Sequence, residues 1–181
     1  MTTRICFIRH GETHWNVDKR IQGQTDIPLE TGRAHALAMA FSAGHHTFDA
    51  IYSSNLMRAH DTANMLAERL GLPVKLMLQL RERHYRIFQG INAAEGLQRQ
   101  PETHARYIAR DVDCGFESGE NMRTFAARVT SGMHEMIRHH ANQSDGAAAI
   151  TCLRIMRFNH CTELSPRHQV FNASKKLRLA G

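Results

Sequence analysis

A short apolar run followed at once by charged residues constrains the fold of this chain more than any other feature. Ile5-Cys6-Phe7-Ile8 is short and partly β-branched or aromatic, which predicts a buried strand. The polar pentapeptide Arg9-His10-Gly11-Glu12-Thr13 comes directly after it. Ligands of open α/β sheets bind beyond the carboxyl ends of the strands, so this pentapeptide stands where a ligand site is expected.

Arginine and histidine side by side at a strand end suit an anionic substrate. The guanidinium of Arg9 is a planar fork of donors that matches phosphate oxygens. The imidazole of His10 can act as a nucleophile or carry a proton near neutral pH. Gly11 lets the backbone approach a ligand closely. A lone motif of this kind is weak, and by itself it favours an exposed turn with chance polar residues.

Strand and helix patterns alternate along the rest of the chain. Apolar periodicity predicts further strands over 49–52, 74–78 and 147–151, and helices between Gly32 and Gly44, over 56–70, over 92–110 with a break at Pro101, and from Glu120 to about 137. The stretch from Trp15 to Pro28 is expected to be irregular. This alternation predicts an α/β fold, a three-layer α/β/α sandwich with a mainly parallel central sheet.

Composition narrows the class of protein. The 181 residues suit one domain, and the formal net charge is +6. Residues 152–181 contribute +5 of this charge and residues 1–151 only +1, so the excess of positive charge lies in the C-terminal segment. Because no aromatic residue interleaves with Lys175 and Lys176, we expect no nucleic-acid partner.

No cysteine or histidine pattern indicates a metal. The four cysteines show no Cys-x-x-Cys spacing, and the thirteen histidines include no His-Glu-x-x-His. His139 and His140 are expected to be solvated at a helix end. No apolar run is long enough for a membrane span, and the N-terminus leads directly into the first strand. We therefore expect a cytoplasmic protein without metal, cofactor or membrane partner; a homodimer remains open.

Further motifs follow the other predicted strands, and together they resemble a known family. They are Arg9-His10-Gly11-Glu12-Thr13, Thr13-x-Trp15-Asn16, Gly23-x-x-Asp26-x-x-Leu29, Ser53-Ser54-Asn55-Leu56-Met57-Arg58-Ala59, Leu80-Arg81-Glu82, Glu117-Ser118-Gly119-Glu120 and Asn172-Ala173-Ser174. In this order they closely resemble the histidine phosphatase superfamily, the phosphoglycerate mutase-like proteins. The resemblance covers nearly the whole chain, which is expected to be one such domain over residues 1–181.

The resemblance implies a role for each matching residue. His10 would be the nucleophile that becomes phosphohistidine, and Glu82 the general acid that protonates the leaving oxygen. Arg9 and Arg58 would clamp the phosphate. The further contacts to phosphate or substrate would come from Asn16, Gln22 and Gly23. This agrees with the chemistry, since phosphoryl transfer needs positive donors around the spreading negative charge.

Two departures from the family pattern bear on activity. Family members carry a second histidine in a His-Gly pair after the strand that matches 147–151, but here Thr151 is followed by Cys152-Leu153-Arg154. A short local deletion would explain this, and the chain from about 152 is expected to be divergent and shortened. The second departure is Arg86, which stands where the family usually has glycine and is expected to disturb the loop that holds Glu82.

Three functions are compatible with the sequence. The favoured one is a phosphohydrolase of phosphorylated small metabolites with a phosphohistidine intermediate, its activity impaired by the loss of the second histidine. The second is a phosphoglycerate mutase, although the long insertion expected of a cofactor-dependent mutase is missing. The third is an inactive protein that binds phosphate esters without turning them over.

Overall fold

The computed structural model describes residues 4–30, 48–140, 148–152 and 170–172. Within these ranges one sheet is formed by β1 (Arg4–Ile8), β2 (Ala50–Ser53), β3 (Val74–Leu76), β4 (Ala148–Cys152) and β5 (Val170–Asn172). The strand order is β3-β2-β4-β1-β5, and every described pairing is parallel. The predicted parallel sheet is confirmed.

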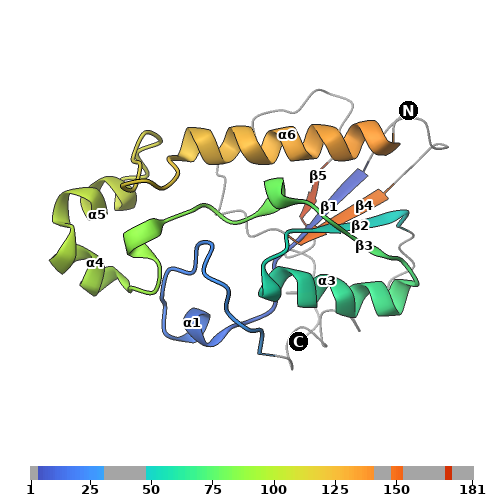
Figure 1. Cartoon of the computed structure of the whole chain (residues 1–181), viewed down its shortest axis with the longest axis horizontal. Helices are drawn as coiled ribbons and strands as arrows, with labels where there is room; N and C mark the ends of the chain where they lie inside the picture. Colours follow the sequence, from blue (N-terminus) through green and yellow to red (C-terminus); the bar gives the residue numbers. More distant parts are fainter. Residues whose placement is uncertain (1–3, 31–47, 141–147, 153–169, 173–181) are drawn as a thin grey trace.

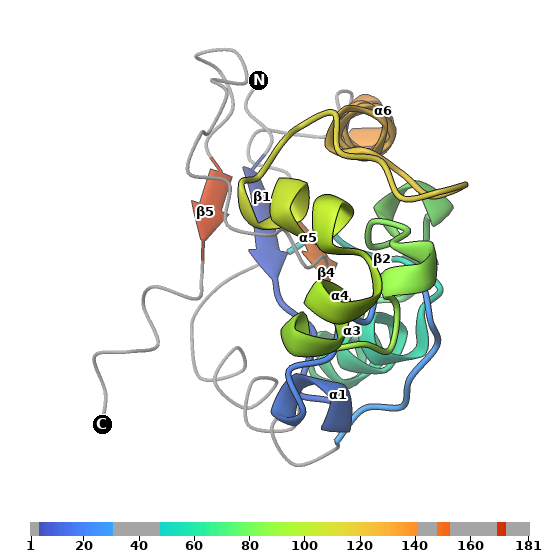
Figure 2. The same cartoon turned by 90° about the vertical axis from the view of Figure 1, so that its left-hand side faces the viewer.

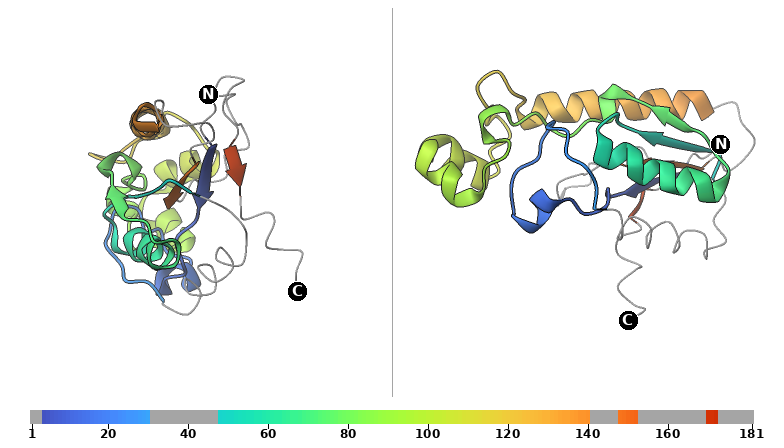
Figure 3. Two further views of the ribbon diagram at one scale, coloured as in Figure 1. Left: turned by 90° about the vertical axis from the view of Figure 1, so that its right-hand side faces the viewer. Right: turned by 60° about the horizontal axis from the view of Figure 1, so that its bottom comes forward.

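Helices cover both faces of the sheet (Figure 1). On one face, α3 (Met57–Leu70) packs against Ile8 and Ile51 through Ala59, Ala63 and Leu66. On the other, α6 (Met122–His140) packs against Ile5, Ala50 and Tyr52 through Phe125, Val129, Met133 and Met136. Figure 3 shows the same sheet between these two helices from other directions. The α/β/α sandwich expected from the sequence is therefore confirmed.

Local signals in the sequence fix several element boundaries. Gly71 ends α3 in the left-handed conformation, with φ 67°. Pro101 separates α4 (Ala93–Arg99) from α5 (Pro101–Ile108) and occupies the first turn of α5. The strand expected over 74–78 is shorter and leads into a 3₁₀ turn, η1 (Leu78–Leu80). The helix expected between Gly32 and Gly44 lies outside the described residues.

Residues 81–121 lie beyond the carboxyl ends of the strands. Figure 2 looks at the sheet from this side and shows α4 and α5 in front of the strand ends, with α1 (His14–Val17) beside them. This part has an apolar cluster of its own, made by Tyr85, Phe88, Ile91 and Phe116. It can therefore form a wall over the strand ends. None of the helices in the described ranges could span a membrane.

One sequence-based expectation is wrong in α6. His140 is buried rather than solvated, and its Nε2 lies 3.0 Å from the hydroxyl oxygen of Tyr52. The inner face of α6 continues from Met133 and Met136 at helical spacing, so His140 falls on the side that faces the sheet. A buried histidine is accommodated there because the hydroxyl of Tyr52 gives its ring nitrogen a hydrogen-bond partner.

Candidate active site

The end of β1 places Arg9 and His10 at the carboxyl edge of the sheet. His10 is buried, and its Nδ1 lies 2.6 Å from the carbonyl oxygen of Gly11. Because a carbonyl can only accept a hydrogen bond, Nδ1 carries the proton. In the neutral ring the lone pair is then on Nε2. This tautomer makes Nε2 the nucleophilic nitrogen.

The start of α3 is tied to the loop that carries His10. The hydroxyl of Thr62 accepts a hydrogen bond from the Gly11 N–H at 3.0 Å and donates one to the Arg58 carbonyl at 2.7 Å. One side chain thus couples β1 to the first turn of the helix after β2. This coupling fixes the backbone on which His10 stands.

Arg58 is almost completely buried, with 1% of its surface exposed. Its Nη2 donates to the carbonyl of Gly23 at 2.6 Å, and its Nη1 donates to the carbonyl of Thr25 at 2.9 Å. The guanidinium therefore supports the loop that contains Gly23. The phosphate-clamp role implied by the family resemblance stays a prediction.

Thr13 connects two of the predicted substrate-binding residues. The Nε2 of Gln22 donates to the Thr13 hydroxyl at 2.7 Å, and that hydroxyl donates to the Oδ1 of Asn16 at 3.1 Å. Oδ1 of Asn16 also accepts from the Thr13 N–H at 3.0 Å. Gln22 Oε1 is buried and makes no hydrogen bond within the described residues. These amides are held in place by the protein itself.

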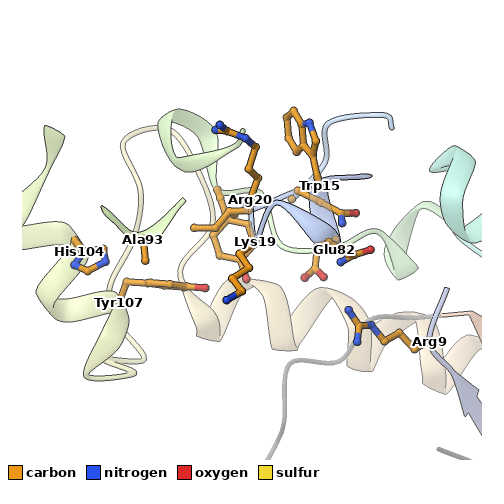
Figure 4. Close-up of a pocket in the computed structure, with 13 residues that line it drawn as sticks. Arg9, Trp15, Lys19, Arg20, Glu82, Ala93, His104 and Tyr107 are labelled. Carbon is orange, nitrogen blue, oxygen red and sulfur yellow. The ribbon is translucent and has the colours of Figure 1, made fainter. Parts of the chain in front are cut away.

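One pocket of about 330 Å³ adjoins this network. Its wall includes most of the predicted site residues, namely Arg9, Asn16, Gln22, Gly23 and Glu82. Figure 4 shows the pocket with Glu82 between Arg9 and the side chains of α5. His10 and Arg58 are not among the lining residues. The structure thus brings five predicted residues around one pocket, while His10 follows Arg9 in the chain and Arg58 donates to the carbonyl of Gly23.

Glu82 is held in the opposite wall. Its side chain is 5% exposed, and its Oε1 accepts a hydrogen bond from the N–H of Arg83 at 2.9 Å. Its backbone carbonyl accepts from Nε2 of Gln24 at 3.0 Å, which connects the two walls of the pocket. The predicted general acid is therefore buried, lines the pocket and is fixed at both its backbone and its carboxyl group.

An arginine that sequence reasoning missed supports the Glu82 segment. Arg128 donates to the carbonyls of Gln79 and Arg81 at 2.9 and 3.0 Å. It also binds both carboxylate oxygens of Glu120, each at 2.7 Å. Arg128 and Glu120 are far from Glu82 in sequence, and only the family-like stretch before α6 pointed to Glu120.

Glu120 is the best-supported carboxylate near the site. Burial by itself raises the pKa of Glu120, but hydrogen bonds from the Arg128 side chain and the His84 N–H lower it by more. The pKa of Glu120 consequently lies below its ordinary value. Its ionised form is the one that the surrounding donors stabilise.

Arg86 adopts the backbone conformation that favours glycine. Its φ is +49°, and its exposed side chain donates from Nε to the carbonyl of Ser118 at 2.9 Å. Glu82 keeps its place in the pocket wall. The effect of Arg86 on the Glu82 loop stays a prediction, and the left-handed backbone explains why glycine suits this position.

A buried imidazole and an arginine at the carboxyl edge of a parallel sheet, with a buried carboxylate in the adjoining pocket, define the class: a histidine-type phosphatase or phosphomutase. The family model of the histidine phosphatase superfamily, branch 1, matches residues 5–168. The chain belongs to this superfamily.

Relatives and solved structures agree with this assignment. The chain is 32% identical over 178 residues to a metal-independent phosphoserine phosphatase from Arabidopsis thaliana, covering 95% of this chain and 74% of that protein. It is 33% identical over 137 residues to a 2,3-bisphosphoglycerate-dependent phosphoglycerate mutase of Gloeobacter violaceus, covering 74% of this chain and 63% of the mutase. The structure of a mycobacterial glucosyl-3-phosphoglycerate phosphatase superposes with a TM-score of 0.69 at 32% identity, covering 81% and 72% of the two chains.

The place of the missing histidine can be located from the strand register. Cys152 is the last residue of β4 and pairs with Ile8 of β1 and Ser53 of β2. The residues after Cys152 therefore follow the strand that lies between the His10 and Arg58 loops. They are Leu153 and Arg154, which lie outside the described residues, so the predicted deletion of a His-Gly pair stays a prediction.

Proposed function

We propose that this chain is a phosphohydrolase that acts on phosphorylated small metabolites through a phosphohistidine on His10. The observation that carries the proposal is the Nδ1 hydrogen bond of His10 to the Gly11 carbonyl, because it leaves Nε2 as the nucleophile at the carboxyl edge of the sheet. The proposal is also supported by relatives that are named phosphatases, one of them a phosphoserine phosphatase.

The reaction proceeds in two displacements at phosphorus. Nε2 of His10 attacks the phosphoryl group, the ester P–O bond breaks, and Glu82 gives its proton to the leaving alcohol oxygen. A water then attacks the phosphohistidine, Glu82 takes the proton of that water, and inorganic phosphate leaves. Arg9 and Arg58 stabilise the negative charge on the transferring group, and Asn16, Gln22 and Gly23 orient it.

Turnover is slow in this proposal because the second histidine is absent. Losing one positioned donor from a site of this kind typically costs about 10²–10³ in rate. Rebuilding the loop by inserting His-Gly after Thr151 should therefore raise turnover on an aryl phosphate by about that factor. A native chain that already turns over at about 10 s⁻¹, a common enzyme rate, would show that another residue fills the role.

The phosphohistidine itself is tested by rapid quenching and mass spectrometry. Brief mixing with a phosphate ester should place an acid-labile, base-stable phosphate on His10, and His10→Asn should carry none. Phosphate on a serine or an aspartate instead would overturn the mechanism. Assays with 3-phosphoglycerate plus its bisphosphate distinguish a mutase, which transfers the phosphoryl group between substrates, from a hydrolase. Binding of vanadate without any phosphoenzyme would identify an inactive binding protein.

A further inference from the structure

Glu82 stands on a segment that has no regular secondary structure of its own. It follows the 3₁₀ turn η1, and residues 81–85 belong to neither a helix nor a strand. A general acid must nevertheless lie within hydrogen-bond reach of the leaving oxygen, about 2.6–3.2 Å. A misplacement of about 1 Å can cost on the order of 10² in rate. The backbone of Glu82 must therefore be fixed from outside the segment.

The guanidinium of Arg128 supplies most of that support. Its Nη1 donates to the carbonyls of Gln79 and Arg81, and its Nη2 donates to the carbonyl of Glu82 at 3.4 Å. Its Nε and Nη2 also donate to the two carboxylate oxygens of Glu120. These five hydrogen bonds match the five N–H groups that a guanidinium carries. Every donor of Arg128 is thus used to connect one carboxylate to the carbonyls around Glu82.

Glu120 holds the segment on the other side of Glu82. Its Oε2 accepts a hydrogen bond from the His84 N–H at 2.9 Å, and its own N–H donates to the His84 carbonyl at 3.0 Å. The two stretches of chain approach closely here, since a Cβ on Gly119 would lie 2.7 Å from the carbonyl oxygen of His84. The Arg128–Glu120 pair therefore binds the backbone both before and after Glu82.

Arg128 is presented by a helix that is packed on the sheet. It lies on α6 one turn before Gly132, where an added Cβ would come within 2.7 Å of the Cβ of Gln79. Ile5 of β1, the strand that leads to His10, belongs to the apolar cluster that this helix forms with the sheet. α6 thus links the segment of the predicted acid to the strand that precedes the predicted nucleophile.

We propose that Arg128 and Glu120 are positioning residues for proton transfer by Glu82. This rests on the proposed function, in which the carboxyl group of Glu82 gives its proton to the leaving oxygen while the ester P–O bond breaks and Nε2 of His10 bonds to phosphorus. Esters with poor leaving groups need that proton most. The rate on such esters consequently depends on the Arg128–Glu120 pair, whereas esters with an acidic leaving group react almost without it.

Two aryl esters of similar size measure this dependence. Phenyl phosphate releases phenol, whose pKa is about 10 like that of tyrosine, and 4-nitrophenyl phosphate releases a far more acidic phenol. The quantity compared is kcat/KM, because it reports the steps up to phosphorylation of His10. Arg128→Met should lower kcat/KM by about 10²-fold for phenyl phosphate and by no more than about threefold for 4-nitrophenyl phosphate. A purely structural loss would lower both values equally.

Milder variants should give smaller losses on phenyl phosphate, and they carry the test if Arg128→Met does not fold. Arg128→Lys keeps the charge but offers three donors in place of five. Glu120→Gln keeps an acceptor for the His84 N–H but loses the ion pair. Each should lower kcat/KM on phenyl phosphate by about tenfold.

Arg123 provides the matched control. It also lies on α6 and pairs with a carboxylate, that of Asp113, but its side chain is exposed. Arg123→Met should therefore leave kcat/KM unchanged for both esters.

A Glu82→Gln background shows whether the pair acts through Glu82. Glu82→Gln should itself lower kcat/KM on phenyl phosphate by about 10²-fold. Adding Arg128→Met to Glu82→Gln should cost no more than about a further threefold, because the positioned proton is already gone. A second full loss in this background would show that Arg128 does not act through Glu82, and would overturn the positioning role.

The outcomes separate the two proposals. If Glu82→Gln slows phenyl phosphate selectively but Arg128→Met lowers kcat/KM equally for both esters, the positioning role is wrong while the proposed function stands. If Glu82→Gln also affects both esters equally, Glu82 is not the general acid and the positioning role falls with that assignment. If the native chain hydrolyses neither ester and forms no phosphohistidine, the proposed function itself fails.

Discussion

The two walls of the pocket are each supported by an arginine, but in different ways. The first wall, residues 21–25, is supported by Arg58, which donates to the carbonyls of Gly23 and Thr25. The second wall, residues 81–86, is supported by Arg128, which donates to the carbonyl of Arg81 and is itself paired with the carboxylate of Glu120. The second wall therefore depends on an ionised carboxylate. The first wall does not, because Arg58 supports it through hydrogen bonds to backbone carbonyls.

A second difference lies in what surrounds each arginine. In the first wall, Gln89 accepts from the Gln24 N–H at 3.0 Å and donates to the Thr25 hydroxyl at 2.8 Å, so neutral amide groups complete the support. In the second wall, Arg83 stacks over the rings of Tyr85 and Phe116, at 5.3 and 4.8 Å from their centroids. The second wall is therefore tied to the aromatic cluster beyond the sheet, and the first to α3.

The largest effect is expected from removing the arginine of the first wall. Arg58→Ala should lower kcat/KM on an aryl phosphate by an amount equal to about 3–4 kcal/mol, because it removes a predicted donor to the phosphoryl group and releases the carbonyls of Gly23 and Thr25. Arg58→Lys should recover only part of the activity, since a point charge cannot replace a planar fork. The exposed Arg69 on the same helix gives the control, and Arg69→Ala should be neutral. Normal turnover by Arg58→Ala would show that Arg58 is not the clamp.

Gly23 tests how tightly the first wall is packed. Its φ is +54°, and an added Cβ would lie 2.5 Å from Oε1 of Gln89, whose hydrogen bonds hold it in place. Gly23→Ala should lower the free energy of unfolding by about 2 kcal/mol, from left-handed strain and a displaced amide. Gly71→Ala is the matched control, because Gly71 has φ +67° but open space around it and should cost only the strain. If Gly23→Ala and Gly71→Ala lowered the free energy of unfolding equally, the side chain of Gln89 would have moved away from the new Cβ without cost.

The second wall should be the acid-sensitive one. Because the folded-state pKa of Glu120 is depressed, its contribution to stability is fully present above its unfolded pKa of about 4.3 and is lost as the pH falls through the folded value. Glu120→Gln should lower the free energy of unfolding by about 1.5 kcal/mol at pH 7 and by much less near pH 3. Urea unfolding at both pH values measures this. The exposed neighbour Glu117 provides the control, and a Glu117→Gln protein with the same pH response would contradict the assignment.

Local patterns predicted the sheet, and the family resemblance implied a site role for Arg58, but neither showed how the walls of the pocket are held. The apolar stripe and Gly71 defined α3, and the run before Arg9 defined β1, because both signals are contained in neighbouring residues. Arg128 carries no such signal, since its role depends on carbonyls and a carboxylate that only the folded chain brings together. The burial of His140 could have been predicted from its spacing to Met133 and Met136.

The smallest effect is expected at Arg86, where the two walls contrast most directly. The first wall has glycine at its left-handed position, Gly23, and the second has arginine, with φ +49°. A side chain in this conformation costs roughly 1–2 kcal/mol, while glycine costs about 0.5–1 kcal/mol of extra chain entropy on folding. Arg86→Ala and Arg86→Gly both lose the hydrogen bond to Ser118, so their comparison isolates the backbone term. We expect the glycine variant to be more stable than the alanine variant by about 0.5–1 kcal/mol in urea unfolding. An alanine variant that equals or exceeds the glycine variant would show that the backbone at residue 86 is not strained. In that case the preference for glycine in the family would have to come from the space its side chain leaves, not from its backbone freedom.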